Sequence, residues 1–178
     1  MPRPGPQLAL IAAAAACAAS AGCGVRIEGG VAADAAVDAR PCTGGDAAQA
    51  SPSGACFFVF TAPATFAGAR DACAAQGAHL AILRSAQDDQ VAGALVGATG
   101  TAFIDLTDQA TEGTFVWGDA TAPAYTNWYP AEPNDGGGNY PEDCAVIVGA
   151  RGGQWDDRPC APVPDVGGGS YAYLCQRP

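Results

Sequence analysis

The sequence contains no lysine: all eight of its basic residues are arginines, and 18 acidic residues give it a net charge of −10. Nucleic acids and anionic membrane surfaces are bound by clustered Lys and Arg side chains, so this balance argues against both kinds of partner. Hydrophobic residues make up 49% of the chain, which argues against intrinsic disorder. A chain of 178 residues therefore suits one packed domain with appendages.

The groups that most enzymes use for proton transfer or nucleophilic attack are scarce. The one histidine, His79, stands beside an apolar run, which favours a structural role over catalysis or metal ligation. A single histidine in that position also leaves no credible Ser-His-Asp set. Glu132 and Glu142 could be imagined as the acid and the nucleophile of a glycosidase, but neither has a supporting partner in the sequence. We therefore expect that the protein is not an enzyme.

No apolar run is long enough to predict a membrane-spanning helix. The stretch Leu8–Cys23 is short and mostly alanine. It follows Arg3 and ends in small residues, which is the pattern of a secretory signal. We predict that residues 1–22 are a signal peptide of the lipoprotein type, residues 23–41 an Ala/Gly/Asp-rich tether, and residues 42–178 the folded domain.

The end of the signal allows two interpretations. Ser20-Ala21-Gly22-Cys23 resembles a bacterial lipobox, in which Cys23 becomes lipid-modified and forms the mature N-terminus. The protein would then be an outer-membrane or cell-surface lipoprotein that meets the membrane only through its anchor. Ala19-Ser20-Ala21 offers ordinary cleavage and full secretion instead. Both interpretations predict an exported protein.

The cysteines predict disulfides rather than a metal site. Signal removal takes Cys17 away and acylation would occupy Cys23, which leaves an even set of six: Cys42, Cys56, Cys73, Cys144, Cys160 and Cys175. No Cys-x-x-Cys pair is present, which weakens a structural zinc site. In an exported chain these six cysteines predict three disulfides, and their spacing alone leaves the pairing open.

Helix-start signals and apolar runs predict an α+β domain. Residues 41–55 look like a loop, and Phe57–Phe60 is a buried-strand candidate. Thr65 and Ser85 can cap two helices, which end near Gly77 and Leu95. Further apolar runs, separated after Gly100 by loops rich in Gly, Pro and Asp, predict strands of an antiparallel sheet at residues 79–83, 103–104, 114–117, 144–148 and 171–174.

Ten of the 18 acidic residues fall between Asp105 and Asp157, where only Arg151 opposes them. A solvated acidic face would explain this concentration without any function. Carboxylate and amide oxygens without histidine or free cysteine are, however, the ligands that calcium prefers. The EF-hand pattern is absent, so a calcium site would be built from loops. The long segment 121–143 is a suitable loop, because loops of that length are usually functional or disordered.

The chain resembles the C-type lectin-like domain family over about Cys42 to Cys175. The resemblance rests on an ordered series of short motifs rather than on any one of them. They are Phe66-x-x-Ala69-x-x-x-Cys73, Gly77-Ala78-His79-Leu80-Ala81-Ile82, Phe103-Ile104-Asp105-Leu106, Thr111-Glu112-Gly113-Thr114-Phe115-Val116-Trp117, Tyr125-Thr126-Asn127-Trp128, Glu132-Pro133-Asn134, Glu142-Asp143-Cys144, Trp155-Asp156-Asp157 and Tyr173-Leu174-Cys175.

The resemblance implies a fold, a disulfide pattern and two calcium sites. The fold would pack two helices on small antiparallel sheets beside a long calcium-binding loop. The disulfides would be Cys73–Cys175 and Cys144–Cys160, with Cys42–Cys56 closing an N-terminal hairpin as in long-form members. A principal calcium site would use Glu132, Asn134, Glu142, Asp156 and Asp157. A second would use Asp108, Glu112, Asp135 and Asp143.

The function implied is calcium-dependent binding of glycans or glycoconjugates. In the family, residues at the positions of Glu132, Asn134, Glu142 and Asp156 also bind two vicinal sugar hydroxyls. Glu132-Pro133-Asn134 is the variant associated with mannose, fucose, glucose or N-acetylglucosamine. A cis peptide bond at Pro133 would point the side chains on either side of it the same way.

Two departures from the family pattern favour an alternative function. Asp156 stands where the sugar-binding motif has asparagine, so the site loses an amide donor and a sugar hydroxyl meets two acceptors. The segment from Glu132 to Glu142 is longer than in compact members and contains three consecutive glycines. The alternative is a calcium-stabilised domain that binds a protein without binding sugar. Four carboxylates around one ion would also make folding depend strongly on calcium.

Overall fold

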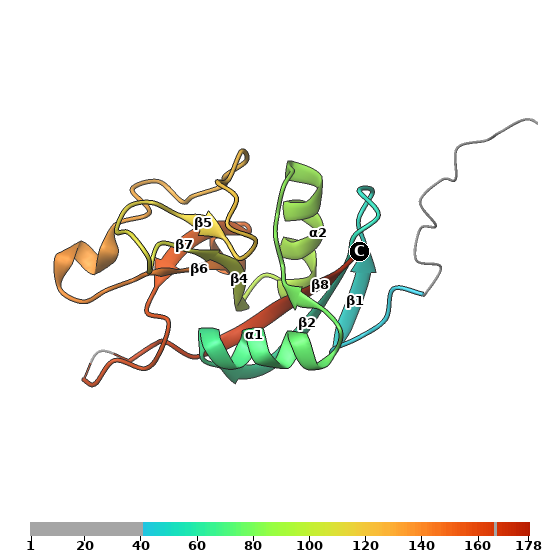
Figure 1. Ribbon diagram of the computed structural model, residues 1–178, viewed down its shortest axis with the longest axis horizontal. Helices are drawn as coiled ribbons and strands as arrows, with labels where there is room; N and C mark the ends of the chain where they lie inside the picture. Colours follow the sequence, from blue (N-terminus) through green and yellow to red (C-terminus); the bar gives the residue numbers. More distant parts are fainter. Residues whose placement is uncertain (1–40, 166) are drawn as a thin grey trace, which may run out of the picture. The chain divides into compact units, whose positions relative to one another are not determined.

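The computed structural model describes residues 41–165 and 167–178, so the predicted signal peptide, Cys23 and most of the tether lie outside the described residues. One mixed sheet runs in the order β1-β2-β8-β4-β6-β7, with β3 paired to β8 and β5 paired to β4 (Figure 1). Its strands are β1 (Ala47–Ala50), β2 (Cys56–Ala64), β3 (His79–Leu80), β4 (Thr101–Thr107), β5 (Val116–Trp117), β6 (Cys144–Val148), β7 (Gln154–Arg158) and β8 (Tyr171–Arg177).

Both predicted helices are present and begin at the predicted caps. Thr65 accepts a hydrogen bond from the Gly68 N–H at the start of α1 (Phe66–Ala75), and Ser85 accepts one from the Asp88 N–H at the start of α2 (Ala86–Val96). The first helix ends just before Gly77, whose φ of 65° suits a residue without a Cβ. Neither helix is long and apolar enough to cross a membrane, among the residues described.

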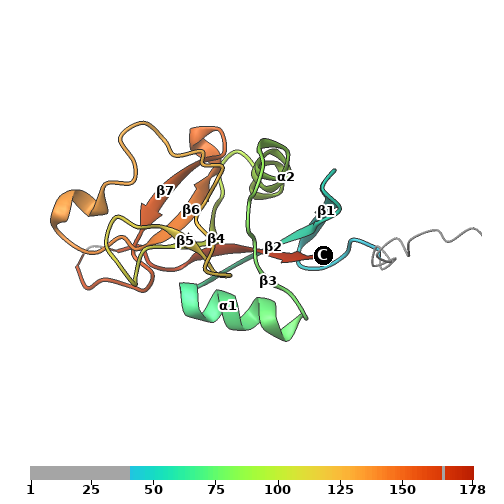
Figure 2. The same cartoon turned by 45° about the horizontal axis from the view of Figure 1, so that its top comes forward.

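The alternation of β2 assigns one helix to each face of the sheet. Phe57 and Val59 pack in a cluster with Val91 of α2, while Phe58 packs in the opposite cluster with Phe66 of α1. Successive strand residues point to opposite faces, which places the helices on opposite sides of β2 and β8. Figure 2 shows this arrangement directly. Burial of these aromatic and aliphatic side chains on both faces supplies the main stabilisation of the domain.

Three disulfides cross-link the domain, and one of them joins residues far apart in the sequence. They are Cys42–Cys56, Cys73–Cys175 and Cys144–Cys160, the pairing that the resemblance implied. Cys73–Cys175 spans 102 residues and joins α1 to the last strand. Cross-links of this kind stabilise a fold largely by restricting the unfolded chain, and long closed loops contribute most.

Several predicted elements differ in extent from those observed. Residues 41–55 were expected to be a loop, but they contain β1, which pairs with β2. The strand predicted at 79–83 is shorter than expected: only His79 and Leu80 form a strand, β3, which pairs with β8 before the chain continues to α2. β7 was not predicted as a strand because its two aspartates break the apolar pattern. The strands also form one continuous sheet with a parallel β4–β8 pair, where small antiparallel sheets were expected.

The irregular segments gather beside β5, β6 and β7, on the side of the domain away from β1 (Figures 1 and 2). The long loop 121–143 includes the short 3-10 helix η1 (Asp135–Gly138), and a second one, η2 (Gly149–Arg151), joins β6 to β7. Trp128 of the loop forms an isolated bridge with Trp155 of β7. The loop is therefore tied to the strand that carries Asp156 and Asp157.

Candidate functional site

Five of the predicted site residues meet where the long loop crosses β7, and we call them the principal cluster: Glu132, Asn134, Glu142, Asp156 and Asp157. Carboxylate oxygens of Glu132, Asp156 and Asp157 lie within 4.8 Å of one another. Asp156 and Asp157 are each 1% exposed although they are charged and adjacent in the sequence. Burial of this many acids is costly unless cations or hydrogen bonds compensate for it.

Asp157 fixes the path of the loop over the strand. Its Oδ2 accepts hydrogen bonds from the backbone N–H groups of Asn134, at 2.9 Å, and Asp135, at 2.7 Å. Its Oδ1 is buried and has no hydrogen-bond partner among the described residues. One oxygen therefore holds the loop while the other stays free for a ligand.

The remaining members contact this group from the loop. The Asn134 amide donates to Glu132 Oε2, and the Glu132–Pro133 peptide bond is cis, as hypothesised from the sequence. Glu142 Oε2 accepts from the Gly136 N–H at 2.7 Å, while its Oε1 is buried without a hydrogen bond in the described part of the chain. The structure thus brings all five residues together, but Asn134 and Glu142 lie outside the tightest triad.

Two arginines enter the principal cluster, and sequence reasoning missed both roles. Arg151 Nη1 lies 2.7 Å from Asp156 Oδ2 and 3.1 Å from Glu132 Oε1. Arg158 pairs with the same Asp156 oxygen and lies 3.5 Å from Glu142 Oε1. The available signals were Arg151 as the lone base in the acidic segment, and Arg158 directly after Asp157. The guanidinium groups supply donors beside the position where the family's asparagine amide is missing.

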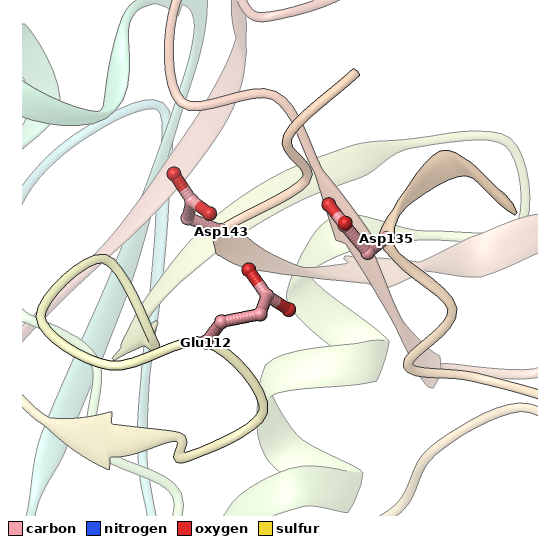
Figure 3. Close-up of side chains that lie close together, drawn as sticks. All are labelled: Glu112, Asp135 and Asp143. Atoms are coloured by element: carbon pink, nitrogen blue, oxygen red, sulfur yellow. The ribbon is translucent and has the colours of Figure 1, made fainter. Parts of the chain in front are cut away.

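A second group, the auxiliary cluster, consists of Glu112, Asp135 and Asp143 with Asp108 beside them. Figure 3 shows the first three carboxylates facing one another, and their oxygens lie within 4.8 Å. Asp108 is not part of that triad. Its Oδ2 accepts from the Gly113 N–H at 2.9 Å, and its buried Oδ1 is without a partner among the described residues. Asp135 links the clusters, because its Oδ1 accepts the Glu142 N–H.

Burial raises the pKa of several acids in the two clusters. Burial raises the pKa of Asp156 to about 6 against the opposing attraction of Arg158, and it also raises the pKa values of Asp157 and Glu142. The pKa of Asp143 is raised by burial and by repulsion from Asp135. These shifts mean that the charged carboxylates are held in an environment that disfavours their charge.

The donor set suits calcium. Four acids of the two clusters each keep one buried oxygen without a hydrogen bond among the described residues: Asp108, Glu142, Asp156 and Asp157. Buried polar atoms in native proteins normally have a partner, so such oxygens need an explanation, and a bound cation is one. Calcium takes six to eight oxygen ligands in flexible geometry, which loop carboxylates can supply. Neither cluster contains a sulfur or nitrogen ligand that would favour zinc or copper.

The base of the long loop is anchored by Asp89 of α2, a residue that the sequence did not single out. Its carboxylate accepts hydrogen bonds from Trp155 Nε1 at 2.6 Å, Asn127 Nδ2 at 2.7 Å and the Tyr125 hydroxyl at 3.1 Å. Burial raises the pKa of Asp89 in spite of these three donors. One buried carboxylate therefore joins α2, β7 and the loop that carries the principal cluster.

The fold and the clusters define a small, disulfide-bonded α+β domain that presents buried carboxylates on a long loop. The family described as the Lectin C-type domain matches residues 62–166, and the chain belongs to this family. Versican core protein of Rattus norvegicus is 36% identical over 109 residues, which cover 60% of this chain and 4% of that protein. The chain thus corresponds to a small part of that relative.

Solved structures of the family support the fold assignment. The carbohydrate-recognition domain of cow CD23, whose structure was determined in the presence of GlcNAc2Man3 oligosaccharide, has a TM-score of 0.59 at 27% identity, covering 69% of this chain and 87% of that chain. A calcium-independent type II antifreeze protein has a TM-score of 0.58 at 27% identity, covering 69% and 85%. The fold is thus shared by a carbohydrate-recognition domain and an antifreeze protein, so it does not by itself define a function.

Proposed function

We propose that the domain binds carbohydrate through a calcium ion held by the principal cluster, with a second ion at the auxiliary cluster. The observation that carries this proposal is that Glu142, Asp156 and Asp157 each keep a buried carboxylate oxygen without a hydrogen bond from the described residues, beside Glu132 and Asn134. When bound, calcium would coordinate two vicinal sugar hydroxyls, as in mannose, fucose, glucose or N-acetylglucosamine. The sugar in the cow CD23 structure supports this class of ligand.

The side chains of the chain itself would orient the sugar. Glu132 and Glu142 offer acceptor oxygens to hydroxyl hydrogens, and the Asn134 amide and Arg151 offer N–H donors to hydroxyl oxygens. The arginines thus compensate in part for the amide that Asp156 lacks. The four acids of the cluster and its two arginines leave a charge of −2, which one divalent ion would neutralise.

A calcium-stabilised domain that binds a protein ligand without sugar is the second candidate. The observation that favours it is Asp156, whose two carboxylate oxygens can only accept hydrogen bonds while the acid is ionised. Its Oδ2 is already taken by both arginines. The structural similarity to an antifreeze protein also supports this candidate, because that protein has the same fold and is not described as a carbohydrate-binding protein.

Retention on immobilised mannose tests the two functions. The wild-type chain is expected to be retained with calcium and released by chelator. Glu132→Gln combined with Asn134→Asp is expected to abolish retention, because it reverses acceptor and donor at two positions without changing the net charge. Asp71→Asn, at an exposed position of α1, is the control and is expected to be retained. A wild-type chain that ignores mannose and other glycans, yet melts at a lower temperature in chelator, would favour the protein-binding function.

We also propose that the protein is exported and held at the cell surface through lipid on Cys23, with free secretion as the alternative. The six cysteines of the described residues are all paired in disulfides, which form and persist mainly in oxidising compartments. Replacement of Cys23 by serine is expected to move the protein from the membrane fraction to the medium, as measured by fractionation and immunoblotting. An unchanged distribution would contradict the anchor.

A further inference from the structure

Arg151 is paired with two carboxylates that the principal cluster would also use to bind a metal ion. Its Nη1 bridges the two carboxylates of Glu132 and Asp156, at 3.1 and 2.7 Å. The side chain of Asp156 is 1% exposed and that of Glu132 is 8% exposed, so water screens the two carboxylates only weakly from the guanidinium. The family match and the acid motifs do not assign this residue a role.

The surrounding backbone and an aromatic ring hold the guanidinium in place. Arg151 ends η2, and Gly152, with φ of 69°, turns the chain back into β7. This tight turn brings Arg151 over Asp156, five residues later. On its other side the guanidinium lies over the Tyr129 ring, 4.4 Å from the centroid, at a distance typical of a cation–π contact. Tyr129 is fixed in turn by its N–H bond to the Trp155 carbonyl.

The oxygen partners show where calcium and arginine would conflict. Asp156 Oδ1 is without a hydrogen-bond partner among the described residues, so a metal can use it while Oδ2 keeps both arginines. Glu132 differs, because Oε1 faces Arg151 and Oε2 accepts from Asn134. A metal ligated by Glu132 must therefore share an oxygen with one of these donors or displace it, and it also faces repulsion from the nearby guanidinium.

We propose that Arg151 is an internal cation that competes with calcium for the principal cluster. It offsets part of the negative charge of Glu132 and Asp156 when calcium is absent and lowers the calcium affinity of the cluster when calcium is present. The inference rests on the proposed calcium site and adds the residue that sets the calcium concentration at which that site fills.

Removal of the charge is expected to shift two measurements in opposite directions. Arg151→Gln in the full chain should bind calcium about 10-fold more tightly by isothermal titration calorimetry, because a cation no longer opposes the ion. The same variant should melt several degrees lower than wild type in chelator, because Glu132 and Asp156 each lose one of their partners. Arg84→Gln removes the exposed partner of Asp119 and should change neither quantity.

Arg151→Lys separates charge from packing. It keeps the cation and is expected to bind calcium within about threefold of wild type, since the competing charge remains. Equal or weaker calcium binding by Arg151→Gln, with wild type binding normally, would overturn the inference and leave the calcium site intact. Calcium binding by none of the proteins would remove the proposed function together with the inference. If Arg151→Gln fails to fold in chelator, the comparison is made with Arg151→Lys and Tyr129→Leu, which loosens the guanidinium and should tighten calcium binding.

Discussion

Replacement of Asp157 by asparagine is expected to lower the calcium affinity of the principal cluster about 100-fold, since one of its ligand charges is lost. Asp157 is the member with a free buried oxygen and no arginine partner among the described residues. Its negative charge is thus the most available to an added cation. Calorimetry on chelator-stripped protein should show one calcium site fewer than wild type, and retention on mannose should be lost.

Asp157→Asn is expected to lower calcium affinity without lowering the stability of the calcium-free protein. Burial raises the pKa of Asp157, which means that its charge destabilises the folded state without a metal. Asparagine keeps a carbonyl oxygen for the N–H groups of Asn134 and Asp135. The melting temperature in chelator is therefore expected to be equal to or above that of wild type. Asp71→Asn controls for loss of an exposed acid, and undiminished calcium binding by Asp157→Asn would contradict the ligand assignment.

Both helices and most of the strands could be predicted from the sequence, because their local signals agree with their tertiary contacts. The caps at Thr65 and Ser85 begin the helices observed, and the alternation of β2 fills two faces of the sheet. The three disulfides required the resemblance to a family as well, since spacing leaves the pairing of six cysteines open. β1 and β7 were missed for a common reason: most of their residues are alanine, glutamine or aspartate, and tertiary pairing overrides the weak strand preference of these residues.

The acidic residues of the site could be predicted from the sequence, whereas the long-range contacts that hold them and offset their charge could not. The motifs around Glu132, Glu142 and Asp157 are short and contiguous, so each predicted a ligand before any contact was known. Arg151 and Asp89 act across the fold: one reaches back from η2 to the loop, and the other holds Trp155 from α2. Arg151 is the lone base of the acidic segment, but neither its local sequence nor that of Asp89 identifies which residues it contacts. Long-range ion pairs and buried hydrogen bonds therefore had to come from the structure.

Replacement of Asp89, which anchors the long loop, is the second substitution with a large expected effect. Asp89→Ala is expected to lower the free energy of unfolding by about 3 kcal/mol, because three donors lose their acceptor and the Trp155 N–H is fully buried. The melting temperature should fall by roughly 10 °C. Calcium affinity should fall as well, although no ligand is changed, because Tyr125 and Asn127 hold the start of the loop that carries Glu132. Thermal unfolding and calcium calorimetry measure the two effects.

A substitution at Asp88, the preceding residue of α2, distinguishes loss of the loop anchor from a general loss of stability. Its carboxylate accepts from Ser51, Ser53 and Ser85, so it ties α2 to the β1–β2 hairpin and not to the long loop. Asp88→Ala should therefore destabilise the domain yet leave calcium affinity close to wild type at temperatures where both variants are folded. Equal loss of calcium affinity in the two variants would mean that global stability controls the site. A loss confined to Asp89→Ala would mean that one carboxylate of α2 preorganises the calcium loop from its base, and binding energy is gained when such a loop needs no further ordering.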